Sequence, residues 1–207
     1  MTHDFFAQKA AQYEHNSQRV QNVDQISQAV LKHTQLHSGM RLLDFGAGTG
    51  LLLERVAPFV AHITAVDVSP SMTAQLRAKA GAIACELEIV ERDLCQGDLP
   101  DAWLGAFDGV ISSMTLHHIA DIPALLLIFK RLVKAGGFIA LADLDSEDGS
   151  FHTEDTGVFH HGFDRAALSA QAQAAGFVEV NTFDASVMQK PHGAYSVFVL
   201  VAHQQTS

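Results

Sequence analysis

Apolar residues recur along the chain with two spacings that alternate from one segment to the next. Large apolar residues stand three or four positions apart over 5–13 and 20–31, which predicts two helices with a break at Asn16 and Ser17. Short apolar runs predict strands at 40–45, 63–67, 105–112 and 138–143, and an alternation of polar and apolar residues predicts a further strand at 86–91. Helical spacing separates them at 49–57, 69–79 and 122–132. Strands that alternate with helices in this way predict a parallel sheet covered by helices on both faces.

The pattern changes after this alternation. Residues 145–162 are polar and acidic with no regular spacing, and a connection of that length is typical of a functional or mobile segment. A helix is expected at 164–174, where Asp164 can cap its first turn. Two further strands, at 178–183 and 195–202, are expected to form an antiparallel pair at the edge of the sheet.

Composition places the chain among folded, single-domain proteins. It has 207 residues, of which 48% are hydrophobic and 17% are charged, and this balance excludes a disordered chain. Its apolar stretches are shorter than the ~18 residues that a membrane span needs, and its start lacks the apolar core of a signal peptide. Cys85 and Cys95 form neither a metal-binding spacing nor a disulfide framework. We therefore expect a cytoplasmic protein without a membrane partner.

Charge argues against a nucleic-acid partner. The chain carries 13 Lys and Arg against 23 Asp and Glu, a formal net charge of -10. Beyond Ala135 the only basic residues are Arg165 and Lys190. Because a phosphate backbone is neutralised by clustered cations, the sequence favours a small-molecule substrate.

A glycine-rich loop joins the first predicted strand to the helix after it. The segment LLDFGAGTG, residues 42–50, allows a sharp bend and a close approach of ligand to backbone. A dinucleotide site requires G-x-G-x-x-G, but the third glycine comes one position early and Leu51 follows it. Asp44, just before the loop, suits a cationic ligand better than a diphosphate. A tight turn without a ligand is the alternative interpretation.

Further acidic residues end the next two predicted strands. Asp67 can accept hydrogen bonds from both hydroxyls of a ribose, or it can cap the helix that begins at Ser69. Asp93 follows the third strand, where it can contact a ligand or bond its own backbone. Because the carboxyl ends of parallel strands meet at one edge, these acids are expected to lie together.

Five motifs follow one another along the chain: LLDFGAGTG, VDVSPSM, RDL, FDGVISSMTLHHIAD and LVKAGGFIALAD. In this order they resemble the motifs of class I S-adenosylmethionine-dependent methyltransferases. The resemblance implies an α/β fold, a Rossmann-like three-layer α/β/α sandwich. Its seven-stranded, mostly parallel sheet would have the order 3-2-1-4-5-7-6 and an antiparallel last strand. The single domain, 1–207, would then consist of cap helices at 1–38, a cofactor-binding core at 39–143, a substrate loop at 144–163, and a final helix with a strand pair at 164–207.

The resemblance also implies roles for individual residues. Asp44 would lie near the amino group of the methionine part of the cofactor, Asp67 would hold the ribose hydroxyls, and Tyr13 would close over the cofactor from the cap. Arg19 is a further candidate in the cap. The loop backbone would approach the methionine part through Gly46, Ala47, Gly48, Thr49 and Gly50. The adenine would contact Val68, Met72, Asp93 and Leu94. The end of the fourth strand would line the methionine side with Ser112, Ser113 and Met114.

Histidines supply the candidate catalytic groups. A hydroxyl or activated carbon that accepts a methyl group benefits from a general base, and imidazole suits that role near neutral pH. The candidates are His117, His118, His152, His160 and His161. Structural or solvent-exposed roles are the alternative for each. His152, Glu154, Asp155, His160 and His161 lack the compact spacing of a metal site, and no metal is expected.

Three functions remain open at this stage. The favoured one is methyl transfer from S-adenosylmethionine to a small acceptor, with S-adenosylhomocysteine as product. A non-catalytic S-adenosylmethionine-binding sensor or scaffold is the second, and an NAD-dependent oxidoreductase is the third. SSMT stands where methyltransferases of bases and glutamine carry Asn-Pro-Pro-Tyr or Asp-Pro-Pro-Tyr, which argues further against nucleic acid. The acceptor, the attacked atom and the choice between monomer and homodimer are left open.

Overall fold

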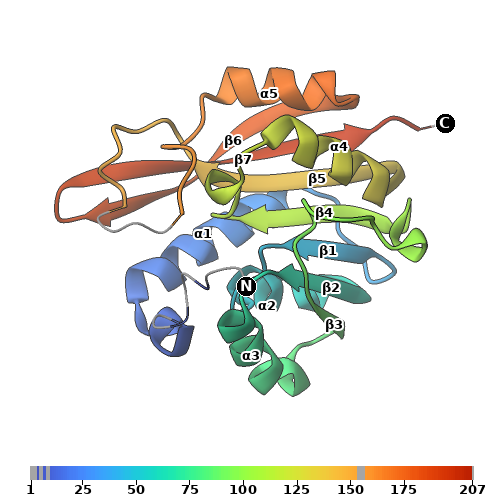
Figure 1. Cartoon of the computed structure of the whole chain (residues 1–207), viewed down its shortest axis with the longest axis horizontal. Coiled ribbons are helices and arrows are strands. Elements are labelled where there is room, and N and C mark those ends of the chain that lie inside the picture. Colours follow the sequence, from blue (N-terminus) through green and yellow to red (C-terminus); the bar gives the residue numbers. More distant parts are fainter. Residues whose placement is uncertain (1–3, 5–6, 8–9, 153–156, 207) are drawn as a thin grey trace.

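The structure, a computed structural model, describes residues 4, 7, 10–152 and 157–206. Its centre is a seven-stranded sheet in the order β3-β2-β1-β4-β5-β7-β6 (Figure 1). The first five strands pair in parallel, and β7 runs antiparallel to both of its neighbours. The strands are β1 (Arg41–Phe45), β2 (His62–Asp67), β3 (Glu86–Glu91), β4 (Phe107–Ser113), β5 (Val133–Leu144), β6 (Phe177–Lys190) and β7 (Gly193–Gln204). The expected strand order is confirmed.

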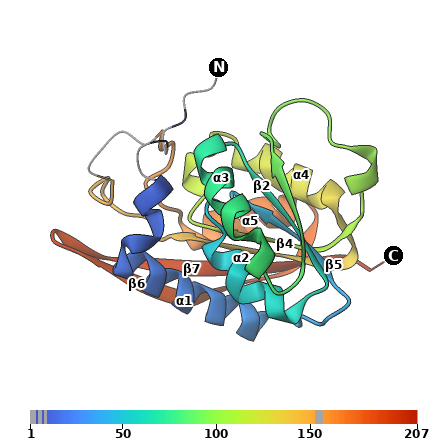
Figure 2. The same cartoon turned by 90° about the horizontal axis from the view of Figure 1, so that it is seen from below.

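Helices cover both faces of this sheet. They are α1 (Ser17–His33), α2 (Leu51–Val56), α3 (Pro70–Lys79), α4 (Ile122–Leu132) and α5 (Arg165–Ala174). Residues of α1, α2 and α3 share one apolar core with the sheet, and residues of α4 and α5 share the other (Figures 1 and 2). Side chains alternate between the two faces of a strand, so that Val110 of β4 enters one core and Ile111 the other. The three-layer sandwich is therefore confirmed.

The amino-terminal cap differs from its prediction. The described part of the first expected helix is a 3-10 helix, η1 (Ala10–His15), and the remainder lies mostly outside the described residues. The expected break is present because the Asn16 side chain accepts a hydrogen bond from the Arg19 backbone and starts α1 afresh.

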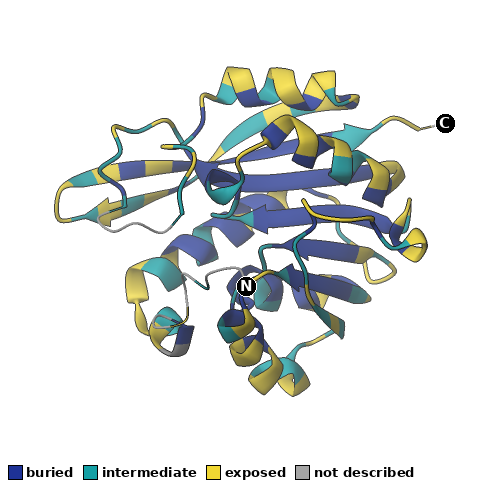
Figure 3. Cartoon of the chain, viewed as in Figure 1, coloured by how far each residue is buried: buried dark blue, intermediate teal, exposed yellow. Residues whose placement is uncertain are grey.

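The carboxyl-terminal strand pair is longer than predicted. Beyond the sheet, β6 and β7 continue as a hairpin that projects on the left of Figure 1. Exposed and less exposed residues alternate along this part of β6, as Figure 3 shows, because the hairpin has one covered face. A search for continuous apolar runs therefore misses it. Of the helices in the described ranges, none has both the length and the apolar character that crossing a membrane requires.

Candidate functional site

The glycine loop between β1 and α2 is held against the sheet and leaves one side open. The backbone N–H groups of Gly46 and Ala47 donate to the Val66 carbonyl at 2.8 and 3.1 Å. A Cβ at Gly46 would clash with the Thr115 side chain, and one at Gly50 would lie 2.6 Å from Leu76. At Gly48, whose φ of 56° itself favours glycine, no heavy atom of the described residues beyond its two chain neighbours lies within 4 Å of the Cβ position. The outer glycines are therefore required by protein packing, whereas Gly48 faces space that a ligand can occupy.

Asp44, at the end of β1, is a buried carboxylic acid without a complete set of partners. Its residue is 1% exposed, and its Oδ2 atom has no hydrogen-bond partner among the described residues. Burial, together with the nearby charge of Asp67, raises the pKa of Asp44 to about 8. A cationic donor at this position would satisfy the orphaned oxygen and restore the charged form.

Asp67, at the end of β2, organises the loop. Its Oδ2 accepts from the backbone N–H of Gly48 at 2.7 Å, and its Oδ1 accepts from that of Ser69 at 2.8 Å. Burial raises the pKa of Asp67, although these two hydrogen bonds oppose the rise. Ser69 itself caps α3 by accepting from the Met72 backbone. Each carboxylate oxygen of Asp67 keeps a second lone pair, so the cap does not exhaust what this side chain can bind.

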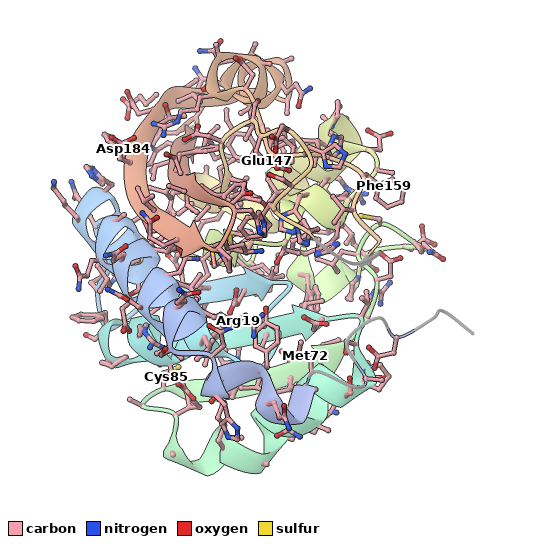
Figure 4. All side chains as sticks on the ribbon, turned by 90° about the vertical axis from the view of Figure 1, so that its left-hand side faces the viewer. Arg19, Met72, Cys85, Glu147, Phe159 and Asp184 are labelled. Carbon is pink, nitrogen blue, oxygen red and sulfur yellow. The ribbon has the colours of Figure 1, made fainter. Side chains whose placement is uncertain are left out.

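A groove of two connected lobes runs along the carboxyl ends of the strands. Both lobes are lined by Tyr13, Gly46, Gly48, Ser113 and Met114. One lobe continues beside Arg19, Asn22, Val23, Asp44, Ala47, Thr49, Leu51, Leu52 and Met188. The other continues beside Phe45, Val66, Asp67, Val68, Met72, Arg92, Asp93, Thr115, His118 and Ile119. In Figure 4, which faces this edge, the labelled Arg19 and Met72 both lie near its middle.

The structure places some expected residues away from the groove. Ser112 is fully buried, and its hydroxyl donates to the Phe45 carbonyl at 2.8 Å. Leu94 is 2% exposed and belongs to the apolar core on the α4 side, while Gly50 packs against Leu76. Asp93 lines the groove, but its carboxylate accepts from Cys95 and Gln96 of its own loop.

The end of β4 and the cap close the groove from two sides. Met114 has a φ of 55°. A residue other than glycine adopts this backbone conformation at a cost in free energy, and such strained residues are typical of functional sites. From the cap, the Arg19 guanidinium lies 3.8 Å from the Tyr13 ring centroid and donates to the Tyr13 carbonyl at 2.8 Å. Burial raises the pKa of the Tyr13 hydroxyl, which therefore stays protonated near neutral pH.

His117 lies behind the groove in a buried pair. It is 2% exposed, and its Nδ1 lies 2.7 Å from Oδ1 of Asp143, which is fully buried at the end of β5. The Asp143 carboxylate also accepts from the backbone N–H groups of His117 at 3.2 Å and Leu144 at 2.7 Å. A carboxylate can only accept from the imidazole, so we assign the proton to Nδ1. His117 thereby joins β4 to β5 and does not line either lobe.

His118 is the candidate base that faces the groove. Its Nδ1 lies 3.2 Å from the Gly157 carbonyl, which assigns the proton to Nδ1 and the lone pair to Nε2. Burial and the neighbouring His117 lower the pKa of His118 to about 4. His152, whose ring centroid lies 6.0 Å from that of His118, has its pKa lowered to about 4 by burial as well. Both imidazoles are therefore neutral near pH 7.

The candidates His160 and His161 do not line either lobe of the groove. The His160 Nε2 atom lies 2.9 Å from the Ile119 carbonyl, and the ring packs against Phe163. His161 is exposed and lies 3.6 Å from Glu147. Glu154 and Asp155, which were weighed from the sequence with these histidines as metal ligands, lie outside the described residues. Within the described part of the chain no three ligating side chains are grouped for a metal ion.

Comparison with known proteins finds a family match and curated relatives. Residues 43–141 match the model of the family described as methyltransferase domain. An uncharacterized methyltransferase of Schizosaccharomyces pombe is 30% identical over 168 residues, 70% of this chain and 59% of the relative. A ubiquinone biosynthesis O-methyltransferase of Xanthomonas oryzae is 32% identical over 114 residues, 55% of this chain and 47% of the relative. The chain therefore spans only about half the length of such curated relatives.

Solved structures share the fold at low sequence identity. Phosphoethanolamine N-methyltransferase 2 of Haemonchus contortus, in complex with phosphomonomethylethanolamine and S-adenosylhomocysteine, matches with a TM-score of 0.72. It is 16% identical, and the match covers 98% of this chain and 60% of that one. The [4+2]-cyclase SpnF matches with a TM-score of 0.71 at 20% identity, over 89% of this chain and 82% of that one. At these identities the likeness establishes the architecture alone.

Proposed function

The chain belongs to the class I S-adenosylmethionine-dependent methyltransferases, and from this premise we propose that it transfers a methyl group from S-adenosylmethionine to a small-molecule acceptor. The observation that carries the proposal is the pairing of Asp44, buried with an orphaned oxygen, with Gly48, which faces open space. A ligand that brings a cationic amine beside the loop backbone would satisfy both. The net charge of -10 supports a small molecule over a nucleic acid as acceptor.

The residues present fit this cofactor along the whole groove. Asp44 would accept from its ammonium group, and Arg19, which lines the same lobe, would pair with its carboxylate. Asp67 would accept from the ribose hydroxyls, with Val68 and Met72 against the adenine. When bound, S-adenosylmethionine supplies a methyl group made electrophilic by a sulfonium. The protein's own task is to orient the acceptor and to take up its proton.

His118 is the residue we assign to proton uptake. Its Nδ1–H is held by the Gly157 carbonyl, which places the lone pair that would accept a proton on Nε2. A pKa of about 4 means that this nitrogen is unprotonated across the physiological range. His117, held by Asp143 behind it, would act as a positioning residue because the pair fixes the backbone at the start of this turn.

The experiment that tests the function supplies labelled S-adenosylmethionine and a metabolite extract to the full chain. We expect a labelled small product, and less of it from the Asp67→Ala variant when S-adenosylmethionine is limiting. Tight binding of S-adenosylhomocysteine without any labelled product, over fractionated extracts, would contradict transfer and favour a non-catalytic binding protein.

A second variant tests the assigned base. His118→Gln should lower the transfer rate by about 10²- to 10⁴-fold, the usual contribution of a general base, with S-adenosylhomocysteine affinity nearly unchanged. The exposed residue His161 provides the matched control, His161→Gln, which should transfer at the wild-type rate. A His118→Gln variant that is as fast as the control would remove the assignment.

A further inference from the structure

Two cations near the groove are each held by a backbone carbonyl and an aromatic ring: Arg19, which lines the lobe beside Asp44, and Lys190, which lies two residues beyond Met188 on the hairpin. Lys190 donates from Nζ to the Phe151 carbonyl and lies 3.6 Å from the Phe151 ring centroid. Arg19 is held in the same way by the carbonyl and ring of Tyr13. In the ranges that the structure describes, neither cation has a carboxylate at ion-pair distance. By contrast, Arg165 pairs with both Asp145 and Asp184.

The register of the hairpin places Lys190 on the same face of β6 as Met188, which lines the lobe beside Arg19. Ser186, Met188 and Lys190 alternate along β6 and therefore share one face. The Ser186 hydroxyl donates to the side chain of Asn22, and Asn22 and Met188 both line the lobe beside Arg19. Lys190 is the next residue outward on this face.

Electrostatic coupling agrees with that position. Burial lowers the pKa of Lys190, and the charge of Arg19 lowers it further, whereas Glu147 raises it. Lys190 in turn contributes to the lowered pKa of His152, whose ring centroid lies 5.1 Å from that of His117. Lys190 thus interacts electrostatically with Arg19 of the cap and with His152.

Apolar side chains pack beside these polar groups. Phe151 is buried, and Met114, Met188 and Tyr13 pack in the same apolar cluster. A site of this composition binds an apolar body and orients it through a few polar groups. Here the polar groups are the Lys190 ammonium on the hairpin, which has no carboxylate at ion-pair distance among the described residues, and the neutral imidazole of His118, just after β4.

On the basis of the proposed function, we propose that Lys190 binds an anionic group, a carboxylate or a phosphate, of a methyl acceptor whose reacting atom lies beside His118. The cofactor brings one carboxylate, which Arg19 would take, and this leaves the Lys190 charge for the acceptor. The hairpin that carries Lys190 would thereby select acids over neutral molecules of the same shape.

The test uses the full chain saturated with S-adenosylhomocysteine and titrated with benzoate, phenyl phosphate and the neutral benzamide. We expect at least one of the two anions to bind about tenfold or more tightly than benzamide, as a charge-assisted hydrogen bond provides. Lys190→Gln should abolish this preference, and Lys190→Arg should retain it. Lys130 is a matched control because it also bonds a carbonyl and lies near a ring, 5.3 Å from the Phe177 centroid, so Lys130→Gln should behave as wild type.

The outcomes separate the two proposals. If S-adenosylhomocysteine binds but neither anion is preferred over benzamide, or if the preference survives Lys190→Gln, the anionic acceptor is refuted and methyl transfer is untouched. If S-adenosylhomocysteine itself does not bind the wild-type chain, the proposed function fails, and the role of Lys190 falls with it.

Discussion

The protonation state of Asp44 makes cofactor binding depend on pH. Its carboxyl group is 1% exposed, and burial with the neighbouring Asp67 raises its pKa to about 8. At pH 7 the protonated form then exceeds the ionised form by about tenfold. An ammonium group beside Oδ2 favours the ionised form, so binding must expel the proton.

The size of the pH effect on the dissociation constant follows from that pKa. If binding requires the ionised form of Asp44, the dissociation constant scales with the ratio of total to ionised carboxyl. That ratio falls from about 100 at pH 6 to about 2 at pH 8. S-adenosylhomocysteine should therefore bind about 50-fold more tightly at pH 8 than at pH 6, a difference of about 2.3 kcal/mol. Nearly one proton should be released per molecule bound at pH 6.

Isothermal titration calorimetry at pH 6, 7 and 8, in buffers of different ionisation enthalpy, measures both the affinity and the released proton. Asp44→Asn is the matched control because it preserves the shape and removes the titration, so its affinity should change little over this range. Equal wild-type affinities at pH 6 and 8, or a slope of the same size in Asp44→Asn, would refute the reasoning.

The remaining predictions concern the same edge of the sheet. Because the pKa of Asp44 is higher in the folded than in the unfolded protein, its contribution to the free energy of unfolding is complete below the unfolded pKa of 3.8 and is lost as pH rises through about 8. The ligand-free Asp44→Asn variant should therefore resist urea better than wild type at pH 8. Gly48→Ala should weaken S-adenosylhomocysteine binding because its Cβ would enter the groove, and its φ of 56° adds a backbone strain of about 1 kcal/mol that should lower the melting temperature less than Gly50→Ala does. Gly50→Ala should chiefly lower the melting temperature, because its Cβ clashes with Leu76; the reverse order of effects would contradict the assignment. Asp67→Ala should weaken that binding by about 1–3 kcal/mol in calorimetry, and an unchanged dissociation constant would count against the ribose assignment.

Local sequence patterns predicted the layers of this fold well. The inner parallel strands β1, β2 and β4 are short apolar runs because both of their faces are buried, whereas the edge strand β3 alternates. Helices between the parallel strands begin at capping residues such as Ser69 and Asp121. The strand order came from the motif resemblance, since alternation alone is compatible with several orders. The pairing of the last two strands was predicted, but their outer part, 184–194, was expected as a connection because only one face of it is covered.

The candidate site was predictable where it is built from one segment and not where it is built from several. The glycine loop and the acids at the ends of β1 and β2 follow directly from their positions. The role of His117 depends on Asp143, 26 residues away, and nothing in the local sequence distinguishes His117 from His118. Met188 reaches the groove only because β6 extends past the edge of the sheet.

The measurement that tests the central claim most directly is a titration of the full chain with S-adenosylhomocysteine and, separately, with NAD. The account predicts a dissociation constant on the order of micromolar for S-adenosylhomocysteine, about −8 kcal/mol, and no detectable binding of NAD. Binding of NAD with no binding of S-adenosylhomocysteine would contradict it.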